Sequence, residues 1–251
     1  MCKDCGCTIA GTEHDHHHHH HTDAHEHVHD NPQLNDAKTV SVIQKILDKN
    51  DHEAAHNRAH LDKAGVLGIN LMSSPGSGKT TLLEYLADVA PFRFAVVEGD
   101  LETNRDAERL RAKGIEAHQI QTGSACHLDA FMVHKGLHHI ALDDIDVLFV
   151  ENVGNLVCPA SYDVGTHLNI VLVSVPEGND KIAKYPVMFR QADLVLITKT
   201  DLLPYFDYDI EAEKAAARAL KPNVDILEVN INDIDSIKAV AEWIAFKKKM
   251  R

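Results

Sequence analysis

The fold of this chain is decided by residues 73–81, which read Ser-Ser-Pro-Gly-Ser-Gly-Lys-Thr-Thr. They follow the apolar run Leu67–Ser73 and lead into the helical pattern Lys79–Val89. A strand, a glycine-rich turn that ends in Lys-Thr and a helix together form the phosphate-binding loop of many nucleotide-binding proteins. The usual pattern has glycine at its first position, where this chain has Ser73, and the other positions fit. The stretch therefore predicts a site for nucleotide phosphates.

The residue types of this loop suit the binding of phosphate. Gly76 and Gly78 let backbone N–H groups converge on phosphate oxygens, and the helix that follows presents its positive dipole end to them. We expect Lys79 to reach the β- and γ-phosphates as a catalytic group, and the Thr80 hydroxyl to coordinate Mg²⁺. The loop residues predicted to bind nucleotide are Gly76, Ser77, Gly78, Lys79, Thr80 and Thr81.

After Gly65 the sequence alternates short apolar runs with helical segments. Several runs are continuously apolar and β-branched, as expected of strands covered on both faces. The expected strands are Leu67–Ser73, Phe92–Glu98, Ala117–Gln121, Asp146–Glu151, Leu168–Val175, Asp193–Lys199 and Val224–Val229. The expected helices include Lys79–Val89, Asn104–Lys113, Glu211–Leu220 and Asp233–Phe246. This pattern predicts an α/β fold of the P-loop NTPase class, with a mostly parallel sheet of about seven strands and helices on both faces.

Two acidic strand ends are expected beside the phosphate loop. Asp100 comes directly after the second expected strand and Glu151 ends the fourth. Ligands bind beyond the carboxyl ends of parallel strands, so we expect both carboxylates to face the phosphates and hold Mg²⁺ directly or through water. Asp100 is also our candidate catalytic carboxylate. The alternative at either position is an exposed loop carboxylate. No glutamine occupies a water-positioning place, so we expect slow intrinsic hydrolysis.

The base is predicted from Thr198-Lys199-Thr200-Asp201, which ends the sixth expected strand. The stem of Lys199 can lie along the plane of the base, and Asp201 can accept hydrogen bonds from guanine N1–H and N2–H₂. Adenine has no matching donors and would leave the carboxylate unpaired, which is costly. GTP is therefore the expected nucleotide. The GTPase consensus has asparagine where this chain has Thr198, which weakens or replaces one orienting hydrogen bond.

A second group of residues suits a transition metal. Cys126 and His127 follow the third expected strand, and Cys158 follows the fourth, so all three are expected at the nucleotide-facing edge. Two thiolates and an imidazole suit Zn²⁺ or Ni²⁺. Three ligands from one chain leave a four-coordinate site incomplete, and a site shared across a two-fold dimer would complete it. Two buried cysteines without a ligand are the alternative.

Residues 1–36 are predicted to be a disordered metal-binding tail. They hold seven acidic residues, one basic residue and ten of the 19 histidines, with too few apolar residues to form a core. The candidate ligands are Cys2, Cys5 and Cys7 and the run His16, His17, His18, His19, His20 and His21. A cytosolic thiol cluster more often binds metal than forms disulfides. The imidazoles should hold several ions weakly and exchangeably. A purification tag is disfavoured because the run is internal.

The composition excludes several classes of partner. The 251 residues carry a net charge of −13 without a basic stripe, which argues against nucleic acid and anionic membranes. No apolar run approaches a membrane helix, and no signal peptide begins the chain, so we expect a cytoplasmic protein. Residues 37–251 are expected to form one GTPase domain that opens with a helix over 37–63. His52, His56 and His60 are spaced four apart on that helix, and we interpret them as a solvated stripe rather than a metal site.

Together these motifs resemble the HypB family, GTPases that help to insert nickel into NiFe hydrogenase. The resemblance rests on the phosphate loop, Glu98–Asp100, Cys126-His127-Leu128, Glu151–Pro159 and the N-terminal Cys-x-x-Cys-Gly-Cys. It implies a GTP-dependent homodimer with a metal site of Cys126, His127 and Cys158 at the interface. It also implies a separate high-affinity nickel site of Cys2, Cys5 and Cys7, and a nickel reservoir in the histidine run. The implied partners are the hydrogenase large-subunit precursor and a small accessory protein such as HypA.

Three other functions are open to the sequence. A urease accessory GTPase of the UreG kind would share the fold and chemistry but serve another client. A nickel storage protein with a vestigial nucleotide domain is disfavoured by the intact Lys79, Thr80, Asp100 and Asp201. A partitioning-type ATPase is least favoured, because that family carries an additional lysine where this chain has Ser74.

Overall fold

The computed structural model describes residues 37–100 and 105–251. The predictions for the cysteines and histidines of the first 36 residues therefore lie outside the described residues. None of the helices in the described part is long and apolar enough to cross a membrane.

The described chain forms a seven-stranded sheet in the order β3-β2-β4-β1-β5-β6-β7, and all neighbouring strands are parallel. This confirms the predicted fold class. The strands are β1 (Leu67–Ser73), β2 (Phe94–Asp100), β3 (Glu116–Gln121), β4 (Val147–Glu151), β5 (Leu168–Ser174), β6 (Leu194–Thr198) and β7 (Asp225–Val229). The largest difference from the expected bounds is in β2, which begins two residues later, after the turn that contains Pro91, and continues through Asp100.

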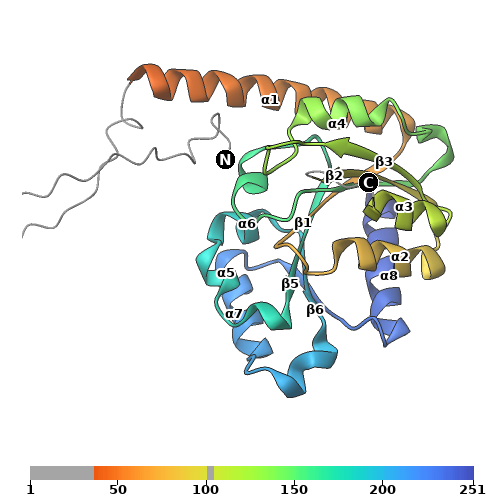
Figure 1. Ribbon diagram of the computed structural model, residues 1–251, viewed down its shortest axis with the longest axis vertical. Helices are drawn as coiled ribbons and strands as arrows, with labels where there is room; N and C mark the ends of the chain where they lie inside the picture. The colour runs from red at the N-terminus through yellow and green to blue at the C-terminus, as the bar shows by residue number, and fades with distance from the viewer. Residues whose placement is uncertain (1–36, 101–104) are drawn as a thin grey trace, which may run out of the picture.

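Helices cover both faces of the sheet, as predicted (Figure 1). One face packs against α2 (Lys79–Val89), α3 (Arg105–Ala112) and α8 (Ile234–Met250) in the first apolar cluster. The other face packs against α1 (Ala37–Ala64) and α4 (Ala130–Leu137) at one end, and α5 (Lys181–Lys184), α6 (Pro186–Gln191) and α7 (Ile210–Leu220) at the other. Neighbouring residues of one strand serve opposite faces, because Leu71 belongs to the first cluster and Met72 to the second.

Helix α4 was not among the expected helices, and it begins three residues after His127. Its N-cap is Asp129, whose carboxylate accepts a hydrogen bond from Met132 N–H at 2.7 Å. The helix is only eight residues long, and its apolar residues are interrupted by His134, Lys135 and Gly136. The sequence pattern of so short a helix is weak, although the aspartate before it was a usable signal.

Helix α1 attaches to the domain through its second half. Val40, Val42 and Ile46 in the first half are exposed, whereas Ala54 and Leu61 are buried. Asn57 is fully buried between them, and its amide donates hydrogen bonds to the carbonyls of Ala130 (2.8 Å) and Val164 (3.2 Å). A buried polar side chain thus fixes α1 to the start of α4.

Replacing this amide should loosen the attachment. In Asn57→Ala two buried carbonyls lose their donor, so we expect the free energy of unfolding to fall by about 2–4 kcal/mol. Urea denaturation monitored by circular dichroism measures the change. The control is Gln44→Ala on the exposed half of α1, where the side chain bonds only to Asp48. Equal effects of the two substitutions would contradict the role given to Asn57.

Candidate functional site

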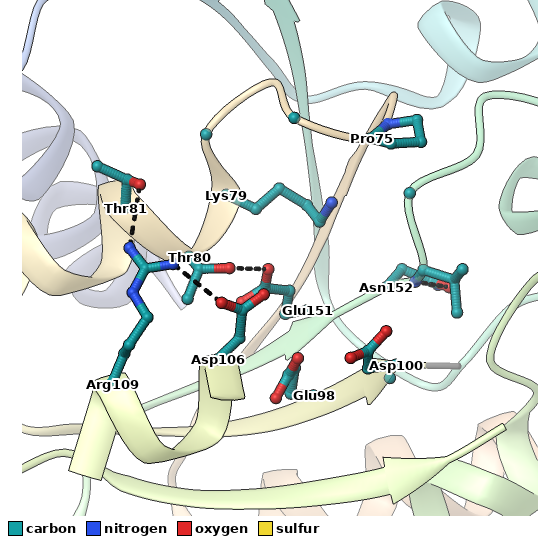
Figure 2. Close-up of a pocket in the computed structure, with 15 residues that line it drawn as sticks. Pro75, Lys79, Thr80, Thr81, Glu98, Asp100, Asp106, Arg109, Glu151 and Asn152 are labelled. Atoms are coloured by element: carbon teal, nitrogen blue, oxygen red, sulfur yellow. Dashed lines mark hydrogen bonds and ion pairs between the residues drawn. The ribbon is translucent and has the colours of Figure 1, made fainter. Parts of the chain in front are cut away.

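A cavity of about 370 Å³ lies at the carboxyl ends of β1, β2 and β4 (Figure 2). The phosphate loop forms one wall, the end of β2 and the start of α3 form another, and the residues after β4 form the third. It contains Lys79, Thr80, Asp100 and Glu151, which the sequence predicts to meet there. The parallel sheet brings these residues together because all three strands end at the same edge.

The phosphate loop has the backbone that its glycines permit. Gly76 and Gly78 have φ angles of 76° and 99°, in the left-handed region that other residues rarely adopt. Gly78 is the N-cap residue of α2, so the helix begins at the cavity. The Nζ atom of Lys79 lies 3.1 Å from Oγ of Ser73, the residue that replaces the usual first glycine. The loop is therefore arranged to direct N–H groups and one lysine toward an anion.

Carboxylates are crowded on the opposite side of the cavity (Figure 2). The Thr80 hydroxyl donates to Oε1 of Glu151 at 2.7 Å, and the Oε2 atoms of Glu98 and Glu151 are buried without a hydrogen-bond partner among the described residues. Burial raises the pKa of Glu98 to about 8, and the neighbouring charges of Glu151, Asp106 and Asp100 add to the shift. Burial also raises the pKa of Glu151, while Lys79 and Thr80 act against it. Orphaned carboxylate oxygens beside a hydroxyl fit a hard divalent cation such as Mg²⁺.

Two polar residues of the cavity were missed by the sequence analysis. Asp106 and Arg109 of α3 line it, and Arg109 bonds to Glu84 at 2.6 Å and to Asp106 at 2.9 Å. Their spacing of three residues on an expected helix would have shown that they share a face, but nothing local indicates that this face meets the phosphate loop. Glu98 was quoted in a motif but was not selected as a site residue.

The segment predicted to bind the base touches the phosphate loop directly. The Thr198 hydroxyl donates to the Ser77 carbonyl at 2.8 Å, and Nζ of Lys199 donates to the Gly76 carbonyl at 2.7 Å. Thr198 is buried, so its hydroxyl makes an orienting bond in place of the consensus asparagine. Among described non-glycine residues, only Lys199 has a positive φ, at 58°. Such a backbone conformation costs free energy and is characteristic of ligand-binding positions.

Asp201 lies on the 3₁₀ turn that follows Lys199. The Asn232 side chain, after β7, donates to Oδ2 of Asp201 at 3.5 Å. The two polar groups therefore face one another at the ends of adjacent strands.

Cys126, His127 and Cys158 converge, and their ligand atoms lie within 4.8 Å of one another. Cys126 and Cys158 are not joined by a disulfide, their Sγ atoms lie 3.0 Å apart, and Sγ of Cys126 lies 3.9 Å from Nδ1 of His127. The imidazole stacks on the Tyr162 ring with centroids 4.0 Å apart. Burial lowers the pKa of His127, which favours the neutral form that binds metal. The set fits a borderline-soft ion such as Ni²⁺ or Zn²⁺.

One buried side chain joins this metal-ligand set to the nucleotide cavity. Asn152 lines the cavity, and its Oδ1 accepts hydrogen bonds from the N–H groups of Leu128 and Val153, both at 3.0 Å. Leu128 directly follows His127 in the sequence. A Cβ atom on Gly154 would lie 2.8 Å from Cα of Pro75, so the loop after β4 is pressed against the phosphate loop. Movement of the loop after β4 would therefore shift residues of both the nucleotide cavity and the metal-ligand set.

Comparison with known proteins agrees with this geometry. Residues 67–228 match the family model described as CobW/HypB/UreG, nucleotide-binding domain. The chain is 50% identical over 228 residues to the hydrogenase/urease maturation factor HypB of Helicobacter hepaticus, across 89% of this chain and 94% of that protein. HypB from Helicobacter pylori in complex with nickel is 49% identical with a TM-score of 0.79, over 80% of this chain and 96% of the other. Hydrogenase maturation factor HypB from Archaeoglobus fulgidus is 36% identical with a TM-score of 0.75, over 80% and 100%.

The raised pKa of Glu98 makes stability depend on pH. Between the ordinary value of 4.5 and about 8, the folded protein keeps a proton that the unfolded chain has released. The free energy of unfolding should therefore fall as pH rises through this window, by on the order of 1 kcal/mol per pH unit. Glu98→Gln removes this dependence, so the variant should be more stable than the parent near pH 8 and similar to it near pH 5.

Urea denaturation across this pH range, without nucleotide or divalent cations, measures the difference. Glu108→Gln, on the exposed side of α3, is the control. If the stabilities of the parent and Glu98→Gln run parallel from about pH 5 to 8, Glu98 is not the group that holds the proton.

Proposed function

Because the chain belongs to the CobW/HypB/UreG family of nucleotide-binding proteins, we propose that it is a GTP-hydrolysing nickel chaperone that assists the insertion of nickel into a hydrogenase precursor. The observation that carries this proposal is the Asn152 side chain, which lines the nucleotide cavity and bonds to the residue after His127. The loop after β4 is thus common to the nucleotide cavity and the set of transition-metal ligands, and Asn152 bonds it to the loop after β3 that carries Cys126 and His127. The names of the relatives support hydrogenase maturation as the context.

The geometry of the cavity supports nucleotide hydrolysis. Lys79 and the N–H groups around Gly78 would hold the phosphates, and Thr80 with Glu151, Glu98 and Asp100 would hold Mg²⁺. Bound Mg²⁺ neutralises charge on the β- and γ-phosphate oxygens. Asp100 would orient or accept a proton from the attacking water at the end of β2. Without a glutamine to position the attacking water, intrinsic hydrolysis would be slow.

Guanine selection would depend on Asp201. Its carboxylate accepts from N1–H and N2–H₂ of guanine, while the Lys199 stem lies along the base. The bonds of Thr198 and Lys199 to the phosphate loop hold this segment next to the cavity. Adenine would leave the Asp201 carboxylate without its two donors.

The metal cargo would bind at Cys126, His127 and Cys158. Three ligands from one chain, with Cys126 half-buried, fit a site completed by a second copy of the chain in a GTP-dependent homodimer. Zn²⁺ competes for such a set. The thiolates of Cys2, Cys5 and Cys7 and the histidine run would supply separate tight and weak nickel sites. Metal binding requires these cysteines as thiolates, which persist in a reducing compartment, so the proposed function implies a cytoplasmic protein.

Urease is the second candidate client. The Helicobacter relatives are named hydrogenase/urease maturation factors, so one HypB protein can serve both enzymes. Either client would receive nickel through the same metal-ligand set, with a small accessory protein such as HypA as the implied partner. Deleting the gene and measuring hydrogenase and urease activity, with and without added nickel, separates the two clients.

Replacing the base-binding carboxylate should change the base that is bound. In Asp201→Asn the introduced amide presents a donor to the guanine N2–H₂ group, so GTP affinity should fall at least about tenfold. Xanthosine triphosphate has a carbonyl at that position and should bind the variant better than GTP. Fluorescent-nucleotide competition measures both affinities and that of ATP. Asp207→Asn, on the exposed loop before α7, is the control. Equal affinity of the parent for ATP and GTP would contradict guanine selection.

Nickel affinity should depend on the bound nucleotide through Asn152. A coupling of about 1–3 kcal/mol corresponds to a change of roughly 5–150-fold in affinity, and it must be equal in both directions. Asn152→Ala removes the bond to Leu128 and should bring the ratio of the nickel affinities with a GTP analogue and with GDP close to one. Asn179→Ala, an exposed amide on the loop before α5, is the matched control.

The measurement is a Ni²⁺ titration of the full chain with Cys2, Cys5 and Cys7 changed to serine and the tail histidines to asparagine. If the parent background binds nickel equally with both nucleotides, the sites are independent and the metal site is structural.

A further inference from the structure

A second group of metal-ligating side chains lies outside the nucleotide cavity and the Cys126 set, between α1 and α4. The two helices run side by side over one face of the sheet (Figure 1). His56 and His60 of α1 meet His134 of α4 and His138 at its C-terminal end. The histidine stripe of α1 is thus not simply solvated, because a second helix supplies facing imidazoles.

We propose that Glu53, His56 and His134 form a binding site for a divalent ion of the zinc and nickel class, distinct from the site of Cys126. One ligand atom from each residue lies within 4.8 Å of those of the other two. Oε1 of Glu53 is 3.3 Å from Nδ1 of His134 and 3.7 Å from Nδ1 of His56. Ligands bound about 2.0–2.1 Å from a tetrahedral ion are about 3.3 Å apart, so little movement would enclose the ion.

The surroundings of His134 orient its ring for this role. Oδ1 of Asn57 lies 2.9 Å from Nδ1 of His134, so without an ion this nitrogen donates its proton to Asn57, and a bound ion would replace that proton between Nδ1 and the oxygens of Asn57 and Glu53. The other ring nitrogen, Nε2, lies 3.1 Å from Nε2 of His138. With an ion on Nδ1, the Nε2–H group can donate to His138, which is the outer-shell hydrogen bond that metal-bound histidines require. Asn57 cannot turn away, because its amide nitrogen is fixed to the Ala130 and Val164 carbonyls.

Access and ligand chemistry also suit a transition metal. The side chains of Glu53 and His134 are 17% and 25% exposed, whereas His56 is 64% exposed, so the ion can enter from solvent while two ligands are already ordered. Two imidazoles and one carboxylate match Zn²⁺, Ni²⁺ and Co²⁺, and a water molecule would complete the four positions. Burial, followed by the charges of His138, His134 and His56, lowers the pKa of His60, which favours the neutral form of that imidazole at the edge of the group.

The location of the site between α1 and α4 means that a bound ion would link these two helices. An ion held by Glu53 and His56 on one side and His134 on the other would link α1 to α4. The start of α4 is already bonded to α1, because Asn50 accepts from Ala130 N–H at 2.9 Å. Asp129, the N-cap of α4, lies two residues after His127. The proposed ion would therefore brace the helix that follows the Cys-His motif, whatever nucleotide the protein hydrolyses.

The test uses the full chain without its other metal ligands. Cys2, Cys5, Cys7, Cys126 and Cys158 are changed to serine and the ten tail histidines to asparagine. We expect this background to bind one Co²⁺ per chain, with the visible absorption of a nitrogen- and oxygen-bound ion, and Zn²⁺ to displace it. His56→Ala and Glu53→Gln should each weaken binding by at least about tenfold. His52→Ala, one turn earlier on the same exposed helix, should change it less than twofold.

Thermal unfolding separates loss of the site from loss of the fold. Zn²⁺ should raise the Tm of the background and of His52→Ala but not of His56→Ala. Because the His56 side chain is mostly exposed, its removal should leave the metal-free Tm unchanged. His134→Ala is not used here, because it also removes the hydrogen bond to the buried Asn57. A background that binds no Co²⁺, or binding that is lost in His60→Ala but kept in His56→Ala, would overturn the assignment.

Discussion

The structure depends on one buried amide that needs partners on a neighbouring loop and on a strand of the sheet. Asn152 lies directly after β4 with almost no exposure, so both ends of its side chain must be hydrogen-bonded. Its oxygen accepts from Leu128 N–H and its nitrogen donates to Asn70 of β1 at 3.3 Å. The same residue lines the nucleotide cavity. A change in the loop after β4 would therefore be transmitted to the residues beside His127 or would break a buried hydrogen bond. This hydrogen bonding supports the proposal that the two sites are coupled.

The nucleotide cavity carries a cost that its ligands would remove. Glu98 and Glu151 each bury a carboxylate oxygen without a partner among the described residues, and Asp100 lies beside them. A cation beside Thr80 would relieve the repulsion, and phosphates would then pair with Lys79 and the N–H groups of the loop. The folded protein holds these carboxylates close together although their burial and mutual repulsion are unfavourable. Carboxylates held in this way are typical of binding sites. The apolar clusters on both faces of the sheet supply the stability that offsets this cost.

Sequence reasoning found the parts of this protein that are local. The phosphate loop is a pattern of nine consecutive residues, and the buried strands are recognisable as continuous apolar runs. From these two signals the fold class could be predicted, and with it the convergence of Lys79, Thr80, Asp100 and Glu151. Contacts between helices could not. Arg109 reaches the cavity, and His134 meets His56, only because α3 and α4 pack against partners distant in the sequence. The first half of α1 shows the same limit. The helical spacing of Val40 and Ile46 predicted a helix, but it could not show that these two side chains are exposed rather than packed against the domain.

The central claim is that the nucleotide changes the metal coordination of Cys126, His127 and Cys158. Nickel K-edge X-ray absorption tests it directly, on the full chain with the tail ligands replaced and one equivalent of Ni²⁺. We predict that the number of sulfur ligands around the ion differs between the GDP-bound and the GTP-analogue-bound protein. The same spectra and the same sulfur count in both states would contradict the claim.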